Sequence, residues 1–254
     1  MTLGLPLPTL FAFLLVLARV SGMVAFLPIP AWRAAPESVR IGLALVITIA
    51  LFPAWPALPN ADPGFAQLTA WAFLEASFGL GMGLAVALLL EGFQVAAQIV
   101  GLQAGYGYSL TVDPTSQADS GVLQVVMALV SGLLFFTLGI HRELIRVLAQ
   151  SLERFPAGTW HITAASVDGI LRLGTNMLST GLRLALPVVA LLLLIDVALA
   201  LLSRMQQQLQ LLSVAFPIKM LATLALLAAL APVIPRIFSA AAARTLAALT
   251  AGWK

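Results

Sequence analysis

The sequence predicts an all-α membrane protein, and three observations support that prediction. Apolar residues make up 61% of the 254-residue chain, and the mean hydropathy is +1.04. Only 9% of the residues are charged, whereas soluble domains carry about 25%. Several apolar runs also reach the roughly 20 residues that a helix needs to cross a bilayer. No stretch between these runs is long enough to form a soluble domain.

The composition also excludes several classes of function. The chain has no Cys, which excludes disulfides, thiol catalysis and cysteine-based metal sites. The net charge is only +3 and the basic residues are scattered, so nucleic-acid binding is not expected. His141 and His161 stand alone, and no nucleotide-binding loop or nucleophile motif occurs. We therefore expect no enzyme activity, no catalytic residue, no metal and no cofactor.

Six apolar helical segments are expected along the chain. Their approximate bounds are 8–27, 41–55, 67–105, 122–140, 176–202 and 211–231. The second is short for a full crossing, whereas the third would be roughly 57 Å long, well beyond the apolar thickness of a bilayer. The fourth is expected to continue as an amphipathic helix to Arg154, where Pro156 and Gly158 stop it. A further amphipathic stretch, 166–175, leads into the fifth.

One narrow face of the third segment carries only small and polar residues. At 100° per residue, seven positions fall within an arc of roughly 80°: Gly83, Ala87, Glu91, Gln94, Gln98, Gly101 and Gly105. Glycines spaced four apart permit close helix packing, so the glycines alone fit a packing face as well as a lumen. The three polar side chains favour an aqueous or protein-filled lumen, because polar groups facing lipid are costly.

A polar loop at 101–121 interrupts the apolar segments. It contains Asp113 and Asp119 but no Lys or Arg. Its turn and breaker signals are Gly105, Gly107, Gly121 and the pair Asp113–Pro114. The loop is either an external connection or irregular backbone folded among the helices, which is tolerated at membrane depth only where protein or water surrounds it. Beside the glycines, Tyr106 and Tyr108 are either a sealing element or ordinary interfacial aromatics.

Charged residues also occur in or near the apolar segments, where such residues usually pair, face a bundle interior or line a pathway. They are Arg19, Glu75, Glu91, Arg183, Asp196 and Lys219. Asp196 and Lys219 are nearly equidistant from the turn at 206–208, so an antiparallel hairpin would place them at similar depth. We predict that these two residues pair, either to neutralise charge within the hairpin or as a proton- or ion-responsive couple.

Several stretches resemble, in the same order and over nearly the whole chain, the FliR family of flagellar type III export-gate proteins and its virulence-secretion relatives, the SctT proteins. These stretches are 17–22, 75–83, 98–105 with Asp113–Pro114, 185–188 and 216–219. Residues 190–232 separately resemble the hairpin protein FliQ. The turn of that hairpin departs from the family, which tends to have Pro and Asn there. Here the turn is Gln-rich, with Arg204, Gln206, Gln207, Gln208 and Gln210.

The resemblance implies a single FliR-like membrane domain over 1–254, built from tilted hairpins. A FliP-like part would cover about 1–185 and a FliQ-like hairpin about 186–235. It implies a helical channel assembled with FliP and FliQ homologues, on which FlhB docks and through which unfolded flagellar subunits are exported. In that family the loop after the third segment plugs the lumen. This loop maps to about 106–121 and includes Tyr106, Gly107, Tyr108, Asp113, Pro114 and Asp119.

The resemblance also implies a location in the bacterial inner membrane, in contact with lipid, at the flagellar basal body. A virulence-type export subunit is the alternative, and a small-molecule or ion transporter is disfavoured because no inverted repeats with matched broken helices are evident. Counting Lys and Arg in the connections favours both termini inside. In the family, however, the FliQ-like turn is cytoplasmic, which puts Arg204 inside and the termini outside, and we expect that orientation.

Overall fold

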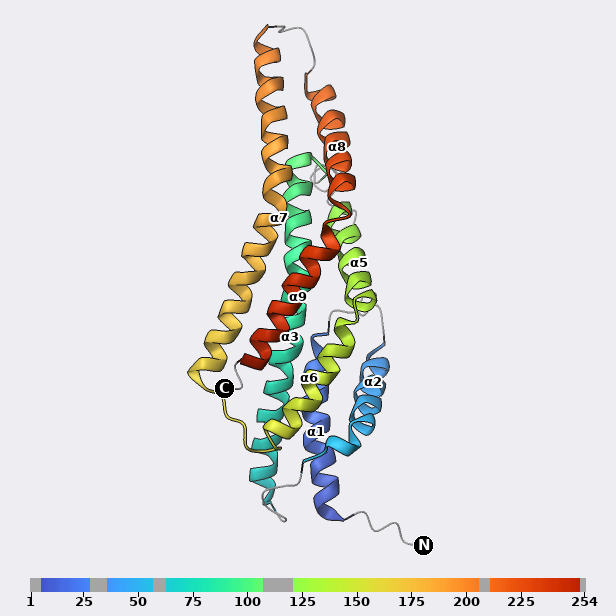
Figure 1. Cartoon of the computed structure of the whole chain (residues 1–254), viewed down its shortest axis with the longest axis vertical. Helices are drawn as coiled ribbons and strands as arrows, with labels where there is room; N and C mark the ends of the chain where they lie inside the picture. Colours follow the sequence, from blue (N-terminus) through green and yellow to red (C-terminus); the bar gives the residue numbers. More distant parts are fainter. Residues whose placement is uncertain (1–5, 28–35, 57–62, 107–120, 206–210, 252–254) are drawn as a thin grey trace. The chain divides into compact units, whose positions relative to one another are not determined.

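The computed structural model describes residues 6–27, 36–56, 63–106, 121–205 and 211–251, and these residues form α-helices, one short 3-10 helix and no strand (Figure 1). The helices are α1 (Leu7–Ala25), α2 (Glu37–Ala50), η1 (Phe52–Ala54), α3 (Phe65–Ala104), α5 (Val122–Thr137), α6 (Ile140–Arg154), α7 (Ala164–Met205), α8 (Leu211–Leu230) and α9 (Ile234–Ala251). The all-α class predicted from the sequence is therefore confirmed.

Three of these helices, α1, α3 and α7, are long and apolar enough to cross a membrane. Two bent pairs, α5 with α6 and α8 with α9, also satisfy these criteria when each pair is taken together. The described residues thus contain 3 candidate spans, or up to 5 if each bent pair counts as one. Helix α2 has only 14 residues, in agreement with the short second segment. The six expected segments all coincide with helices, but not every helix is long enough for a crossing.

Glycine breaks the helix that the sequence predicts to run unbroken from 122 to 154. Gly139 has φ 71°, in the left-handed region, and separates α5 from α6. The two helices are bent by 61° at this break. Glycine adopts this conformation without the steric cost that a side chain would bring. The prediction of one continuous helix is therefore wrong at this position.

Two further helices differ from the sequence-based expectation. Helix α7 continues without interruption from the amphipathic stretch into the fifth segment, and it passes through Pro187. The hydroxyl of Thr163 caps its start by accepting a hydrogen bond from the backbone N–H of Ser166 at 3.3 Å. The residues after 231, for which the sequence analysis expected no helix, contain α9. Pro235 in its first turn and the alanine run that follows favour a helix there.

The chain divides into two compact units, each of which we describe by itself. Unit 1 comprises residues 1–89, 135–174 and 242–254, and unit 2 comprises 90–134 and 175–241. This division follows packing and differs from the FliP-like and FliQ-like parts expected from resemblance. That assignment therefore stays a prediction.

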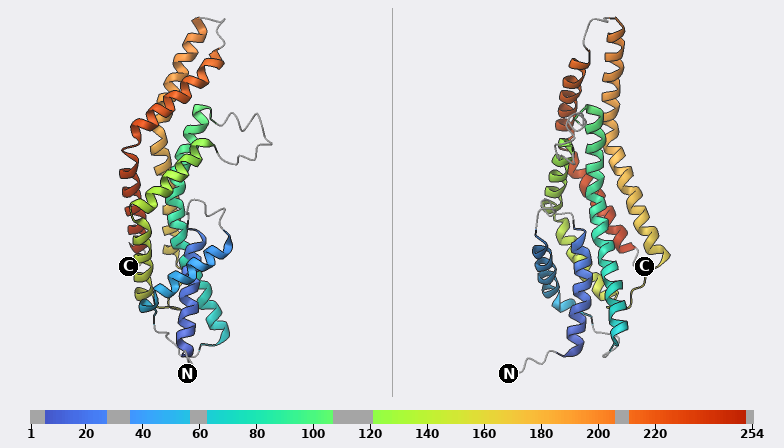
Figure 2. Two further views of the ribbon diagram at one scale, coloured as in Figure 1. Left: turned by 90° about the vertical axis from the view of Figure 1, so that its right-hand side faces the viewer. Right: turned by 180° about the vertical axis from the view of Figure 1, so that it is seen from behind.

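In unit 1, α1 packs closely against the first half of α3, and the two helices lie side by side in Figures 1 and 2. A methyl group on Gly79 of α3 would overlap the carbonyl of Arg19 on α1, and one on Gly83 would overlap the carbonyl of Met23. The absence of side chains at these positions thus sets the distance between the helices. Buried side chains from α1, α3 and α6 complete the core, including Leu15, Val16, Phe78, Met82, Leu144 and Leu148.

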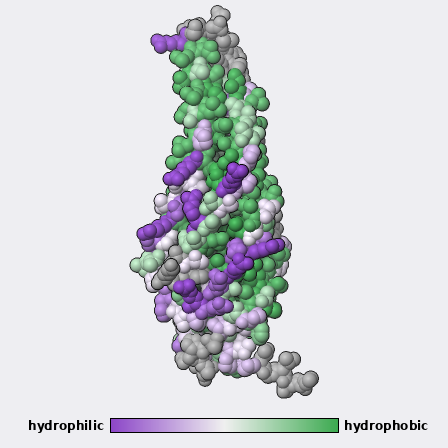
Figure 3. All heavy atoms as spheres, viewed as in Figure 1, coloured by the Kyte–Doolittle hydropathy of each residue, from purple (hydrophilic) through white to green (hydrophobic). Residues whose placement is uncertain are grey.

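In unit 2, the second half of α3 packs against α5 and α7 through small and aliphatic side chains. The buried cluster contains Ala96, Ala97, Val100, Ala104, Leu123, Ala185, Val188 and Leu192. The rings of Phe93 and Phe238, whose centroids are 5.1 Å apart, connect α3 to the start of α9. Many large apolar side chains of α7 and α8 remain exposed, such as Leu194 and Leu221, and much of the surface of these helices is hydrophobic in Figure 3. This surface is suited to contact with lipid or other apolar helices.

Candidate functional site

A polar cluster in unit 2 joins α3, α7 and α8. The Lys219 ammonium lies 2.9 Å from Oδ1 of Asp196 and donates to Oδ2 at 3.1 Å. The side-chain amide of Gln103, in the last turn of α3, donates to the same Oδ2 at 3.0 Å. The predicted pairing of Asp196 with Lys219 is confirmed. The pair is only partly buried, with 39% of the Asp196 side chain and 13% of the Lys219 side chain exposed.

The adjacent end of α3, from which the central loop departs, is held by further contacts. Gly105 has φ 89°, and the next N–H, of Tyr106, returns to the carbonyl of Gly101 at 2.9 Å, which closes the helix end. The Tyr106 hydroxyl donates to the backbone carbonyl of Met220 on α8 at 3.2 Å. Burial raises the pKa of Tyr106 above 10.0, so the phenol stays protonated as a donor. A methyl group on Gly105 would overlap the ring of Phe216.

Most of the predicted plug and turn residues lie outside the described part of the chain. These are Gly107, Tyr108, Asp113, Pro114 and Asp119 in the loop, and Gln206, Gln207, Gln208 and Gln210 in the turn. Tyr106 and Arg204 are described. Arg204 is exposed at the end of α7, and Tyr106 lies at the base of the loop. The contacts above therefore position the start of the predicted plug, whose own role stays a prediction.

The small and polar stripe on α3 separates into two kinds of position. Its glycines pack: Gly83 faces α1 in unit 1, while Gly101 faces Leu123 and Gly105 faces Phe216 in unit 2. Its polar side chains do not. Glu91 and Gln94 are half-buried and Gln98 is exposed, and among the described residues none of the three makes a hydrogen bond or an ion pair. The packing interpretation therefore fits the glycines, and the polar middle of the stripe remains available to a partner or to water.

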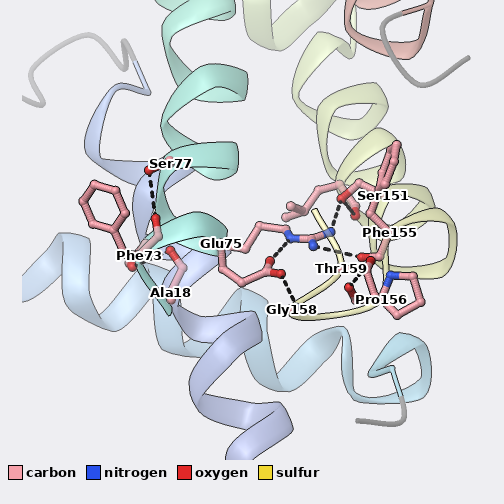
Figure 4. A network of polar contacts seen from close by, with 12 residues as sticks. Ala18, Phe73, Glu75, Ser77, Ser151, Phe155, Pro156, Gly158 and Thr159 are labelled. Atoms are coloured by element: carbon pink, nitrogen blue, oxygen red, sulfur yellow. Dashed lines mark hydrogen bonds and ion pairs between the residues drawn. The ribbon is translucent and has the colours of Figure 1, made fainter. Parts of the chain in front are cut away.

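A second polar network lies in unit 1, and its charged pair and Ser151 are buried (Figure 4). Arg19 of α1 is 0% exposed, and its Nε donates to Oε2 of Glu75 on α3, which is 1% exposed. The other two nitrogens of the Arg19 guanidinium donate to the hydroxyl of Ser151 at 3.0 Å and to the carbonyl of Phe155 at 2.9 Å. The remaining oxygen of Glu75 accepts from the N–H of Gly158 at 3.0 Å. The network thereby fixes α1, α3 and the end of α6 to one another.

Sequence reasoning recognised Arg19 and Glu75 as charges in apolar segments but did not pair them with each other. Unlike Asp196 and Lys219, they are not related by a single turn, because 56 residues separate them. One signal could have suggested this pair. Arg19 lies in the stretch 17–22 and Glu75 in the stretch 75–83, and both stretches carry the family resemblance. Arg183, another charge in an apolar segment, has an exposed side chain on α7, and its role stays a prediction.

Comparisons with known proteins identify the family of this chain. The family described as bacterial export proteins, family 1, matches residues 10–245. The chain is 33% identical over 219 residues to the flagellar biosynthetic protein FliR of Escherichia coli (strain K12), which covers 86% of this chain and 83% of that protein.

Other FliR proteins are also similar. Identity is 31% to FliR of Pectobacterium carotovorum, over 85% of this chain and 83% of that protein. Identity is 26% to FliR of Bacillus subtilis (strain 168), over 82% of this chain and 81% of that protein. The chain therefore belongs to family 1 of the bacterial export proteins, the family of the flagellar biosynthetic protein FliR.

Proposed function

We propose that this chain is a core subunit of the flagellar type III export gate. Membership of the FliR family makes it a component of a flagellar export apparatus. The finer proposal is that it forms, with FliP-like and FliQ-like partners and with FlhB docked on the assembly, a channel for unfolded flagellar subunits. At rest, the loop at about 106–121 closes this channel. We place the assembly in the inner membrane at the flagellar basal body.

The observation that supports a channel is the polar middle of the α3 stripe. Helix α3 is a 40-residue candidate span with a mean hydropathy of 1.9, yet Glu91, Gln94 and Gln98 are at least partly exposed on it. Facing lipid, such groups would be costly, and in membrane proteins they face a partner or a water-filled path. A channel built from several subunits supplies both. A chain that acted alone would leave this face unsatisfied.

A second support comes from the contacts at the base of the loop. A loop that plugs a channel must be anchored at its base, while the rest of the loop must be held weakly enough to be displaced. Gly105, Tyr106 and the Asp196–Lys219 pair provide the fixed attachment. The sequence of the loop provides the weak retention, because it has few large apolar side chains, and burial contributes only about 25 cal/mol per Å². Its Asp residues and lack of Lys or Arg give it no attraction to anionic headgroups.

The proposed plug is tested by deleting residues 107–118 in cells that carry the rest of the export apparatus. We expect the complex to assemble and the membrane to leak small ions and solutes, with secretion affected less than sealing. Conductance in reconstituted bilayers and growth under ionic stress measure the leak. A Gly-Ser replacement of equal length is the control that separates the plug side chains from the connection itself, and we expect it to leak as well. A deletion complex as tight as the wild type would make the loop an external connection.

The proposed assembly is tested by affinity purification of the full chain from its native membrane. We expect FliP-like and FliQ-like proteins to co-elute, and we expect the chain expressed without them to be unstable or heterogeneous. A well-behaved monomer that carries a small solute across liposomes would contradict the proposal and favour a transporter. Export of virulence effectors in place of flagellar subunits would assign the gate to the virulence system.

A further inference from the structure

Arg183 is a charged residue in the candidate span α7, and among the described residues it has no hydrogen-bond or ion-pair partner. Its side chain is exposed on α7, which is a candidate span over Ala164–Arg204. In unit 2 the described acidic residues are Glu91 and Asp196. Asp196 is bound by Lys219, and neither residue forms an ion pair with Arg183. A guanidinium remains charged at any physiological pH, so within a membrane Arg183 needs an anion from outside the chain.

An apolar cavity of about 110 Å³ lies beside this arginine. Side chains of α3, α5, α7, α8 and α9 line it, among them Ala97, Val100, Met127, Val188, Leu230 and Ile237. Among the described residues of its wall, Arg183 alone is charged. Apolar cavities of roughly 150 Å³ stay dry and accept small apolar molecules. A cavity of this composition therefore suits a short run of methylene groups, with the arginine as the charged group in its wall.

The sequence adds a second polar group at the same position. Pro187 lies four residues after Arg183 within α7, and proline has no N–H to donate to the carbonyl of Arg183. This residue therefore offers both the guanidinium donors and a backbone acceptor without its usual helical partner. Arg183 also directly precedes residues 184–202, an apolar run in which Asp196 is the one charged residue. Arginines at such ends extend toward the headgroup region of a bilayer.

We propose that Arg183 and this cavity form a binding site for an anionic phospholipid. The guanidinium binds the phosphate through paired N–H donors, the carbonyl of Arg183 accepts a headgroup hydroxyl, and part of one acyl chain enters the cavity. Arginine provides a planar fork that matches a phosphate group. A carboxylate from a partner protein would satisfy the charge but would leave the apolar cavity empty, so the combination favours an amphiphile. This site stands independently of whether the loop at 106–121 plugs a channel.

The test uses the full chain with its co-purified partners, delipidated in detergent and titrated with palmitoyl-oleoyl phosphatidylglycerol or phosphatidylcholine under native mass spectrometry. We expect the wild type to retain phosphatidylglycerol about tenfold more strongly, and Arg183→Gln to lose that preference, since charge-assisted hydrogen bonds carry about this factor. Arg183→Lys should keep part of it. Arg236→Gln is the matched control, because Arg236 is exposed on α9 and does not line the cavity.

Two further comparisons distinguish binding of the lipid headgroup from binding of the acyl chain. Ala97→Leu narrows the cavity and should weaken binding of the long-chain lipid severalfold while leaving binding of dihexanoyl phosphatidylglycerol unchanged. Inorganic phosphate at millimolar concentration should not displace the lipid, since it lacks the chain. The proposal is overturned if the wild type shows no preference for phosphatidylglycerol, a result that needs no variant to fold. It is also overturned if Arg236→Gln loses binding as fully as Arg183→Gln, or if Ala97→Leu has no effect.

Discussion

Two ion pairs, one in each unit, are built very differently. In unit 1, Arg19 and Glu75 are 0% and 1% exposed, and every nitrogen of the guanidinium has an acceptor. In unit 2, the side chains of Lys219 and Asp196 are 13% and 39% exposed. The first pair lies among three helices that it fixes together. The second pair lies at the C-terminal end of α3, next to the residues where the central loop begins.

The difference shows what burial does to the role of a charge pair. A fully buried pair tolerates the loss of neither partner, because the remaining charge has no water to solvate it. The Arg19 network therefore acts as a rigid structural element. A partly exposed pair is compensated by solvent when it opens, so its contribution to stability is smaller. The Asp196 pair therefore holds the end of α3 with a smaller contribution to stability than the Arg19 network makes in unit 1.

The largest effect is expected from Glu75→Ala. It leaves Arg19 charged and buried, and it removes the acceptor for the N–H of Gly158. The expected loss of stability is about 3–5 kcal/mol, measured by thermal unfolding in detergent and by the abundance of the protein in the membrane. Replacing both Arg19 and Glu75 by Met should cost less than the single change.

The exposed pair of Glu143 and Arg146 on α6 provides a control for this experiment. Its side chains are 45% and 65% exposed, so Glu143→Ala should change stability by no more than about 0.5 kcal/mol. An effect of Glu75→Ala as small as this would remove the contrast between buried and exposed pairs.

The next effect concerns the helix contact that carries the Arg19 network. Gly79→Ala places a methyl group against the carbonyl of Arg19 and should cost about 1–3 kcal/mol, because α1 and α3 must separate. Gly81→Ala, two residues away on the same helix, meets no atom within 4 Å. It should be neutral or stabilise by up to about 1 kcal/mol. Equal stability of the two variants would show that the close approach does not matter.

A smaller effect is expected for Asp196→Ala. Since the pair is partly exposed, we expect a loss of about 1–2 kcal/mol, between the values for exposed and buried pairs. Replacing both Asp196 and Lys219 by apolar residues should restore part of it. Native gel electrophoresis of the assembled complex measures the effect. If Asp196→Ala is as damaging as Glu75→Ala, the proposed difference between the two units is wrong.

The smallest effect is expected for Tyr106→Phe. The change removes one hydrogen bond to the carbonyl of Met220 and keeps the ring, which costs about 0.5–1.5 kcal/mol. Assembly should remain normal, while ion leak through reconstituted complexes should rise slightly above that of the wild type. Phe73→Tyr, at an exposed position of α3, controls for the aromatic exchange. A fully tight Tyr106→Phe complex would show that this contact does not support sealing.

The candidate site was only partly predictable from the sequence. The pairing of Asp196 with Lys219 followed from their equal spacing around one turn, since a hairpin fixes the depth of its residues. The partner of Arg19 did not follow, because no single turn relates α1 to α3. The contact of Tyr106 with Met220 also required the fold, since a backbone carbonyl carries no sequence signal. The exposure of Arg183 on α7 also required the fold, since its apolar sequence surroundings alone do not show whether the side chain is covered.

The sequence by itself determined the all-α membrane class, the positions of the apolar helices and the family. These properties depend on composition and local order along the chain, which hydropathy reports directly. Only the tertiary structure decided which glycines pack, where Gly139 breaks a helix, and which charge meets which. Such features depend on residues far apart in the chain, and on the space between helices, where a single methyl group decides whether two backbones can meet.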